Sequence, residues 1–329
     1  LTLIQWLQSN DWDCVLITEE CAEQPFQTDI CTAYQMPTYN HILRDKLCWG
    51  KDKALYLFAK QKVDVSSFDI IFCSSYYYFP LYAAHLLAKE FNIPLAIDLR
   101  DIAEQWGDTP YFTRQITPFH KLNYWIGKLY ERRQLYMRNR ILQTANIVTS
   151  ISPWHQQLLA HYNQNTHLIY NGYDADIFVP QNTISKYFYI TYLGKLYSTQ
   201  LRDPRLLFEA LKQLIAAHQI DASVIRVLFH TDSKGIKEIQ ELGEQYKLTE
   251  LLDINGYIPR QEILPIMHKS SILLVLTTKS TSNGTHGIMG TKFFENIGVE
   301  KPILCVRSDE ECLADAIHKT NAGLAATNV

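Results

Sequence analysis

The sequence lacks a hydrophobic run long enough to cross a membrane. A spanning helix needs about 20 consecutive apolar residues, whereas the longest strongly hydrophobic strings, such as residues 272–276, have the length of buried strands. A signal peptide is also lacking, and so is an initiator methionine. The chain begins inside residues 1–9, which have the pattern of a helix, so we expect an N-terminal piece to be missing from this sequence.

Cysteine is sparse and irregularly spaced. The seven cysteines, at positions 14, 21, 31, 48, 73, 305 and 312, form an odd set without the paired spacing of a metal site. Six of them stand in or beside apolar or aromatic stretches, as reduced buried thiols do. This pattern argues against a disulfide-stapled protein and favours a protein of the cytoplasm.

Charge of either sign is not in excess. The net charge of −3 gives no reason to expect nucleic acid as a partner. With 47% hydrophobic and 20% charged residues, the composition is that of ordinary globular cores. A chain of 329 residues is about twice the length of a typical domain, so two domains are the default expectation.

The sequence does contain a regular alternation of short β-branched runs with longer amphipathic segments. The runs are continuously apolar, as in strands that are buried on both faces of a parallel sheet. The strand candidates are residues 14–18, 69–74, 95–99, 147–151, 167–170, 188–193, 224–230, 252–255, 272–276 and 303–306. The helix candidates include residues 80–91, 118–144, 204–218 and 236–246.

A polar linker near residues 179–186 separates two series of these elements. We therefore predict an α/β fold of two facing Rossmann-like parallel α/β domains, with the active site in the cleft between them. Residues 1–182 form the N-terminal domain, whose first strand is missing, and residues 183–329 form the C-terminal domain. Ligands of α/β sheets bind at the C-terminal edges of the strands, which would line such a cleft.

The segment NGTHGIMGTKFFENIGVEKPILCV, residues 283–306, has the pattern of a phosphate-binding loop and helix. It contains three glycines that let backbone N–H groups approach a ligand, and a helix whose positive end favours a diphosphate begins near Thr291. Lys292 in the first helical turn is easier to understand if an anion is bound nearby. Glu295 shares its face and could accept hydrogen bonds from ribose hydroxyls. An ordinary loop–helix junction with a solvated Lys–Glu pair is the alternative.

This segment resembles the donor site of family-4 retaining glycosyltransferases. Those proteins carry a Glu before a Gly-rich loop, a second Glu eight residues later, and a Gly-x-Pro-Ile turn. Glu295, Gly298 and Lys301-Pro302-Ile303 match the second half, whereas Gly287 replaces the first Glu. Members that build surface polysaccharides have a Lys-x-x-Glu form, which Lys292 and Glu295 fit. The resemblance implies that the donor is bound by Gly287, Ile288, Met289, Gly290, Lys292 and Glu295.

The segment YLGKLYSTQLRDPRLLFEAL, residues 192–211, resembles the start of the family's nucleotide domain. A first strand is followed by a turn at Gly194 and by a helix that opens at Asp203-Pro204. The family places basic side chains in this loop against the donor phosphates. The resemblance therefore implies donor binding by Gly194, Lys195 and Arg202.

Residues 253–276 resemble the family's loop under the nucleobase, and residues 171–180 resemble its exit from the N-terminal domain. The resemblance implies that Tyr257 and Ile258 pack on the base. Packing of these two side chains on neighbouring helices is the alternative. Similarity to the family thus extends over nearly the whole chain.

In the first domain, IPLAIDLRDIAEQW, residues 93–106, resembles the family's strand that ends in charged residues on the acceptor side. Asp98, Arg100 and Asp101 at the end of a strand are costly to bury unless they are paired or used. The resemblance implies a catalytic role for these three residues, together with Lys195. A structural Asp–Arg pair is the alternative.

Basic residues gather between residues 112 and 145. Against one acid, Glu131, stand Arg114, Lys121, Lys128, Arg132, Arg133, Arg138 and Arg140, with aromatic residues between them. A basic helix with aromatics is typical of a membrane-surface element. We therefore expect attachment to an anionic membrane surface. A helix with one core face and one solvated basic face is the alternative.

The resemblance implies a GT-B fold and transfer of a sugar from a nucleoside-diphosphate donor to a hydroxyl of a glycan or lipid-linked glycan. Retention of anomeric configuration, surface polysaccharide biosynthesis, and terminal helices missing after Val329 are implied as well. No Asp-x-Asp stands in a loop placed to hold a divalent ion, so we expect no metal and no cofactor besides the nucleotide sugar as co-substrate. The protein would be cytoplasmic, on the inner face of the membrane if the basic stretch binds lipid. A GT-B sugar-nucleotide epimerase, or a silent GT-B partner of an active transferase, are the alternatives.

Overall fold

The chain folds into two compact units, each built of parallel strands and helices. A computed structural model describes residues 2–20, 28–40, 49–106, 119–196, 202–277, 286–306 and 312–329. The first unit comprises Leu1–Ala103, Pro110–Ser150 and Gln156–Leu168. The second unit comprises Glu104–Thr109, Ile151–His155 and Ile169–Val329. Parallel sheets in both units confirm the predicted α/β fold class.

The first unit contains a four-stranded parallel sheet in the order β3 (Ile71–Tyr76), β4 (Leu95–Asp101), β5 (Ile147–Ser150) and β6 (Thr166–Leu168). A parallel pair, β1 (Val15–Glu19) and β2 (Thr32–Met36), forms a separate small sheet. Its helices are α1 (Thr2–Gln8), α3 (Gly50–Lys62), α4 (Leu81–Phe91) and α5 (His120–Leu142), and α6 (Pro153–Ala160) leads into β6. Leu95, Ile97 and Leu99 of β4 are fully buried, which explains the continuous apolar run there.

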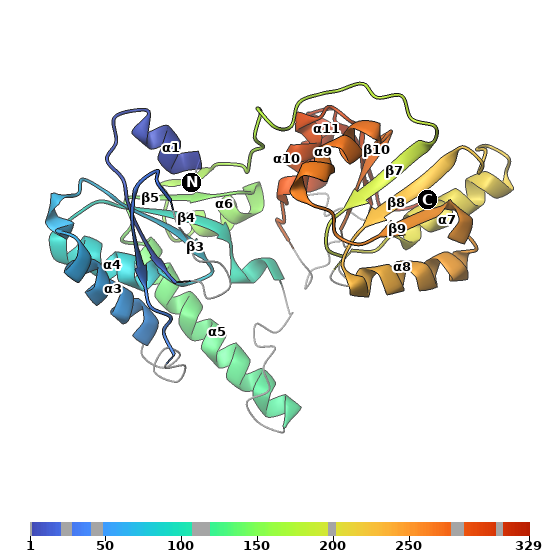
Figure 1. Cartoon of the computed structure of the whole chain (residues 1–329). Coiled ribbons are helices and arrows are strands. Elements are labelled where there is room, and N and C mark those ends of the chain that lie inside the picture. The colour runs from blue at the N-terminus through green and yellow to red at the C-terminus, as the bar shows by residue number, and fades with distance from the viewer. Residues whose placement is uncertain are drawn as a thin grey trace. The chain divides into compact units, whose positions relative to one another are not determined.

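Helix α4 packs between α3 and α5 in the first unit (Figure 1). The buried carboxylate of Asp52 on α3 accepts hydrogen bonds from the backbone N–H groups of Tyr82 and Ala83, at 3.1 and 3.2 Å. These N–H groups belong to the first turn of α4, where a negative charge also complements the helix dipole. Asp52 therefore fixes the start of α4 against α3.

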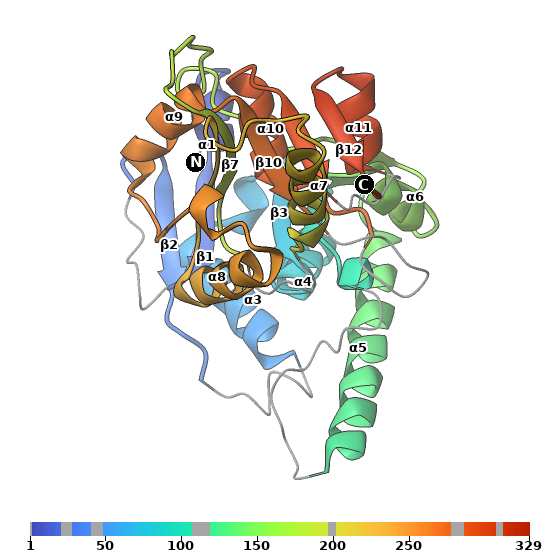
Figure 2. The ribbon, with the colours of Figure 1, turned by 90° about the vertical axis from the view of Figure 1, so that its right-hand side faces the viewer.

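The second unit contains a six-stranded parallel sheet in the order β12-β11-β10-β7-β8-β9. Its strands are β7 (Phe188–Leu193), β8 (Ile225–His230), β9 (Leu252–Asn255), β10 (Ile272–Leu276), β11 (Ile303–Val306) and β12 (Gly323–Ala326). Its helices are α7 (Arg205–Ala216), α8 (Ser233–Tyr246), α9 (Arg260–Lys269), α10 (Thr291–Gly298) and α11 (Leu313–Lys319). Numbered from β7, this is the order 6-5-4-1-2-3 of dinucleotide-binding sheets, and Figure 2 shows the unit from the side.

Two strands were not among the predicted ones. β2 has the sequence TAYQM and pairs with β1 alone, so polar residues occupy part of it. β12 has the sequence GLAA at the edge of its sheet, and a Cβ at Gly323 would overlap the backbone of Ile303 on β11. Neither strand has the β-branched run by which buried strands are recognised in a sequence.

The cysteines that the structure describes are free thiols, as their spacing predicted. Cys73, Cys305 and Cys312 are buried, and Cys14 and Cys31 are half-buried. Burial raises the pKa of the Cys73 thiol to about 12, with Asp52 and Asp98 adding to the shift. This thiol is therefore protonated and unreactive at neutral pH. Cys21 and Cys48 lie outside the described residues.

No helix in the described part of the chain is long and apolar enough to span a bilayer.

Candidate functional site

The loops that follow β7 and β10 come together at the C-terminal edge of the second sheet. β7 and β10 are neighbours, and the strand order reverses between them, with β8 and β9 on one side and β11 and β12 on the other. Ligands of open α/β sheets bind at such a reversal. Residues 194–196 follow β7, and residues 286–290 lead into α10, which begins at Thr291 as predicted. The sheet therefore brings two segments of the predicted donor site to one place.

Lys292 connects these two loops. Its Nζ donates a hydrogen bond to the carbonyl oxygen of Leu193, the last residue of β7. The end of its side chain lies over Gly194, which has φ of 141°, and a Cβ at Gly194 would overlap it. Burial lowers the pKa of Lys292; Glu295 raises it, Arg202 lowers it, and burial prevails. A partly desolvated cation in the first turn of a helix is unfavourable in itself and favours a bound anion.

A buried tyrosine holds the basic loop after β7 in place. The Tyr192 hydroxyl donates to the carbonyl oxygen of Lys195 at 2.9 Å and accepts a hydrogen bond from Arg202 Nη1 at 3.4 Å. The backbone N–H of Leu196 donates to Thr231 Oγ1 and Asp232 Oδ1, both at 3.2 Å. Arg202 also lies close enough to Lys292 to lower its pKa. Lys195, Arg202 and Lys292 thus converge at the strand-order reversal.

Tyr192 is a part of this arrangement that the sequence analysis missed. It is completely buried and packs against Phe229 with ring centroids 5.8 Å apart. A tyrosine in a buried strand needs a partner for its hydroxyl, and its place one residue before the end of β7 directs that hydroxyl to the loop. The need for a partner was the available signal.

Glu295 lies one turn after Lys292 on α10 and is half-buried. Among the residues that the structure describes, its carboxylate takes part in no hydrogen bond and no ion pair, although it raises the pKa of Lys292. A salt-bridged pair was the bland alternative for these two residues. The carboxylate is instead open to hydrogen-bond donors from outside the described residues.

Gly287, at the position of the missing Glu, has no room for a side chain. Its φ is 65°, and a Cβ would lie 2.9 Å from both Ser152 Oγ and Trp154 Cε3 and 3.2 Å from His155 Cδ2. The ring of Trp154 also stacks on His286, with centroids 5.4 Å apart and planes at 17°. The loop is therefore built around glycine here, and the sequence analysis did not foresee the aromatic wall behind it.

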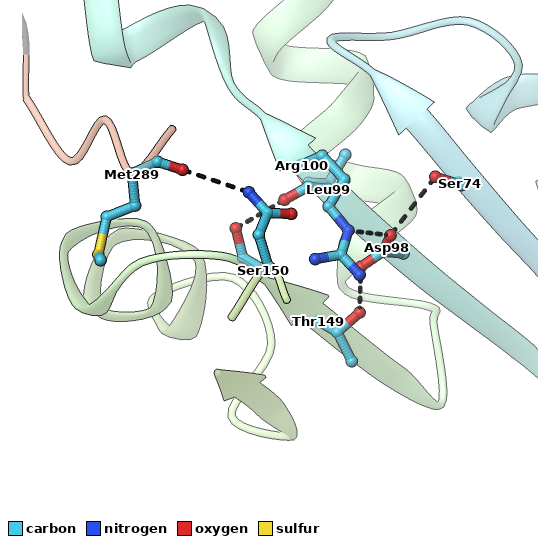
Figure 3. A network of polar contacts seen from close by, with 8 residues as sticks. Ser74, Asp98, Leu99, Arg100, Thr149, Ser150 and Met289 are labelled. Carbon is cyan, nitrogen blue, oxygen red and sulfur yellow. Dashed lines mark hydrogen bonds and ion pairs between the residues drawn. The ribbon is translucent and has the colours of Figure 1, made fainter. Parts of the chain in front are cut away.

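The three residues between Gly287 and the helix differ in what they offer a ligand. The side chain of Met289 is 2% exposed in a core cluster with Phe293, and its carbonyl oxygen accepts a hydrogen bond from Asn171 Nδ2 at 3.2 Å (Figure 3). Ile288 is half-buried. Gly290 caps α10, with nothing within 4 Å of the place where a Cβ would stand. Met289 can thus contact a ligand through its backbone rather than its side chain.

A shallow hollow of about 690 Å³ lies beside the loop that follows β9. Ile258 lines it, together with His230 and Asn255, whereas Tyr257 is 63% exposed. His230 Nδ1 lies 3.1 Å from the carbonyl oxygen of Gly256, so the end of β8 supports this loop. A histidine at a strand end was a signal for this support that the sequence analysis did not use.

The charged cluster of the first unit is an interlinked network (Figure 3). Asp98 is 4% exposed, and its carboxylate accepts hydrogen bonds from Thr149 Oγ1 at 2.6 Å and Ser74 Oγ at 3.4 Å. Arg100 Nε lies 2.7 Å from the same carboxylate. Ser74 and Thr149 are the register partners of Asp98 on β3 and β5. Asp98 therefore forms the Asp–Arg pair that was the alternative to direct catalysis.

Arg100 itself stands at an irregularity of the strand. Ser75 pairs with Leu99 and Tyr76 with Asp101, so Arg100 is the extra residue of a β-bulge. Bulges redirect side chains and are frequent next to active sites. The Arg100 side chain is 39% exposed, and Asp101 is half-buried. The cluster thus presents Arg100 and Asp101, whereas Asp98 supports Arg100 from below.

Within the described ranges, no three His, Cys, Asp or Glu side chains lie together as the ligands of a metal ion would. Independence from metal ions stays a prediction of the sequence, because the described residues do not include every loop of the chain.

The reversing strand order and the basic loops at its edge define a nucleotide-binding α/β protein, and solved structures show which fold it has. Sucrose-phosphate synthase from Thermosynechococcus elongatus has a TM-score of 0.65 at 13% identity, covering 98% of this chain and 78% of that one. A glycosyltransferase from Rickettsia africae has 0.61 at 14%, covering 99% and 79%. The lipopolysaccharide outer core galactosyltransferase WaaB has 0.53 at 10%, covering 90% and 80%. The fold is GT-B.

The family follows from the sequence itself. The model of Glycosyltransferase Family 4 matches residues 1–177, which is more than half of the chain. The chain therefore belongs to glycosyltransferase family 4 and is a sugar transferase, as the resemblance implied. Among curated proteins, none matches the sequence.

Proposed function

We propose that this protein transfers a sugar from a nucleoside-diphosphate donor to a hydroxyl of a glycan or lipid-linked glycan, with retention of anomeric configuration. Surface polysaccharide biosynthesis is the pathway class that the Lys-x-x-Glu form implies. The observation that carries the proposal is Lys292, a partly desolvated cation that joins the helix N-terminus of α10 to the loop after β7. A diphosphate is the group that such a place would accept.

In this proposal the donor is divided among three segments of the second unit. The diphosphate lies against Lys195, Arg202 and Lys292, with the first turn of α10 adding its partial positive charge. The Glu295 carboxylate accepts hydrogen bonds from ribose, and the loop of Tyr257 and Ile258 holds the base. One related structure supports this division: S. aureus TarM, with a TM-score of 0.50 at 12% identity, was solved in complex with UDP.

The transfer breaks the bond between the anomeric carbon and the diphosphate oxygen and forms a bond from that carbon to the acceptor oxygen. In the mechanism proposed for the family, the leaving phosphate takes the acceptor proton, so no separate base is needed. The basic residues then stabilise the charge that develops on the leaving diphosphate, commonly the largest contribution to catalysis. Arg100 and Asp101 are proposed to contact the acceptor, and Asp98 is proposed as the residue that positions Arg100.

A lipid-linked acceptor would place the enzyme in the cytoplasm, peripheral on the inner face of the membrane. WaaB, whose printed name is that of a lipopolysaccharide galactosyltransferase, shares the fold and supports this class of acceptor.

The proposal is tested by calorimetric titration with UDP, GDP and ADP, followed by product analysis with the matching nucleotide sugars in a membrane extract. We expect one diphosphate to bind, and sugar to pass to an extract component. Release of free sugar or an epimerised donor without acceptor would instead identify an epimerase. Binding without any transfer in extract would identify a silent partner protein.

A further inference from the structure

Helix α5 has its polar side chains turned inward. Glu131, Gln134 and Arg138 are 9%, 4% and 1% exposed, at the spacing of one helix face. Gln134 Oε1 accepts a hydrogen bond from Trp49 Nε1 at 3.1 Å, and Arg138 donates to Asn139 Oδ1 at 2.7 Å. A helix at the surface of a soluble domain has the opposite pattern, with the apolar stripe inside.

The outward stripe of α5 is apolar along much of its length. Leu122, Trp125, Leu129 and Tyr136 are 47%, 69%, 71% and 62% exposed, and their spacing of three, four and seven residues places them on one face. Arg132 and Arg140 are exposed on the same face. Figures 1 and 2 show the N-terminal part of α5 reaching past the other helices of the first unit. These side chains therefore have no apolar partner within that unit.

A cavity of about 660 Å³ lies between α4 and the C-terminal half of α5. Its lining includes two cations, Lys89 and Arg140, with Tyr82, Asn92 and Tyr136, and no acidic residue. Arg140 Nη1 also donates to the Tyr136 hydroxyl at 3.3 Å. Tyr136 and Arg140 belong both to the cavity and to the outward stripe of α5. A binding site with two positive charges thus adjoins the exposed apolar face.

We propose that the outward stripe of α5 docks on an anionic phospholipid bilayer and that the α4–α5 cavity holds a phosphate-bearing lipid headgroup. Leu122, Trp125 and Leu129 enter the boundary between headgroups and acyl chains, where aromatic and aliphatic side chains are favoured. Arg132, Arg140 and Lys89 lie at headgroup level and pair with phosphate. The inference rests on the part of the proposed function that places the acceptor at a membrane.

Sedimentation with vesicles of phosphatidylcholine, with and without phosphatidylglycerol, tests the proposal without any sugar donor. We expect wild-type protein to bind the phosphatidylglycerol vesicles and to release as salt rises, because screening weakens the attraction. Trp125→Ser with Leu129→Ser should weaken binding roughly ten- to a hundredfold. Lys89→Gln and Arg140→Gln should each weaken it about fivefold.

Matched substitutions in the second unit serve as controls. Leu324 is 69% exposed on β12, and the Lys319 side chain is 76% exposed on α11. Leu324→Ser and Lys319→Gln remove an exposed leucine and an exposed cation, and should leave vesicle binding unchanged. Acyl chains that carry bromine should quench tryptophan emission of the wild type but not of Trp125→Phe, which reports insertion directly.

Four results would overturn the proposal: no binding at low salt, equal binding to neutral vesicles, equal binding by the Trp125–Leu129 variant, or competition by millimolar glycerol phosphate. The last would identify a site for a soluble anion. Association of the protein with itself that the same variant abolishes, without vesicle binding, would identify a second copy as the occupant. Because nucleotide binding is measured separately, failure here leaves the sugar-transfer proposal standing.

Discussion

At the residue scale, Lys292 and Glu295 divide the proposed donor between them. A charge-assisted hydrogen bond contributes about 1.5–3 kcal/mol. Lys292→Met should therefore weaken diphosphate binding roughly ten- to a hundredfold and leave nucleoside binding unchanged. Glu295→Gln should weaken both alike, because ribose is common to them. Calorimetry with nucleoside, monophosphate and diphosphate measures this, with Lys319→Met as the control; unchanged diphosphate affinity in Lys292→Met would leave a plain loop–helix junction.

The lowered pKa of Lys292 adds a dependence on pH. Burial favours the neutral amine in the free protein, and a bound diphosphate favours the protonated one, so binding raises the pKa. On the alkaline side, binding should take up a proton, and affinity should fall as the pH rises past the lowered pKa of the free protein. Titrations at one alkaline pH in two buffers of different ionisation heat measure the uptake. Lys292→Met should abolish it, and uptake that persists would assign the proton to another group.

Gly287 shows why the family's first Glu cannot simply be restored. A Cβ there meets Ser152 and Trp154 at 2.9 Å, and φ is 65°. We expect Gly287→Ala and Gly287→Glu to lower the free energy of unfolding by about 1–3 kcal/mol, and neither to raise transfer activity. Gly290→Ala is the control, since its Cβ would stand in open space. Thermal unfolding measures the difference, and a stable Gly287→Glu enzyme with higher activity would contradict it.

At the element scale, α5 decides which of its arginines matter for folding. Arg138 is 1% exposed, whereas Arg132 and Arg140 face outward. Arg133 stacks on Trp49, with its guanidinium carbon 3.8 Å from the ring centroid. The basic stretch is therefore not one solvated face, and charge reversal of all four arginines would not test membrane binding alone.

A comparison of Arg138→Ala with Arg132→Ala tests this account of α5. Arg138→Ala leaves buried polar groups without partners and should cost about 2–4 kcal/mol in the free energy of unfolding. Arg132→Ala should stay within about 0.5 kcal/mol of the wild type. Urea denaturation of the two variants measures both values, and equal stabilities would mean that α5 is not packed as described.

At the scale of the whole molecule, the two units offer a separate test of the donor site. All the residues that we assign to the donor belong to the second unit. A ligand at a hundred times its dissociation constant stabilises its binding unit by about 2.7 kcal/mol, which raises the melting temperature of such a unit by roughly 5–10 °C. Differential scanning calorimetry should show two transitions, with one of them raised by diphosphate. A diphosphate that raises neither, or the transition that Arg138→Ala lowers, would contradict the assignment.

The sequence by itself determined the fold class and the location of the donor segments. Continuous apolar runs mark strands that are buried on both faces, which is why β7, β9, β10 and β11 have the bounds that the pattern gave. The family model matches residues 1–177, whereas the Lys-x-x-Glu segment lies in the other half, so the two lines of support for the family come from different parts of the chain. The domain boundary at residue 182 and the role of each site residue stay predictions.

Only the tertiary structure decided what depends on contacts between distant segments. Strand order is set by how strands pair across the sheet, so the reversal between β7 and β10 has no signature in a single run of residues. The hydroxyl of Tyr192, the wall of Trp154 behind Gly287, and the partners of Asp98 all come from other elements. The direction of α5 is of the same kind: periodicity marks its faces, but burial depends on what packs against them, and here the polar face lies inside.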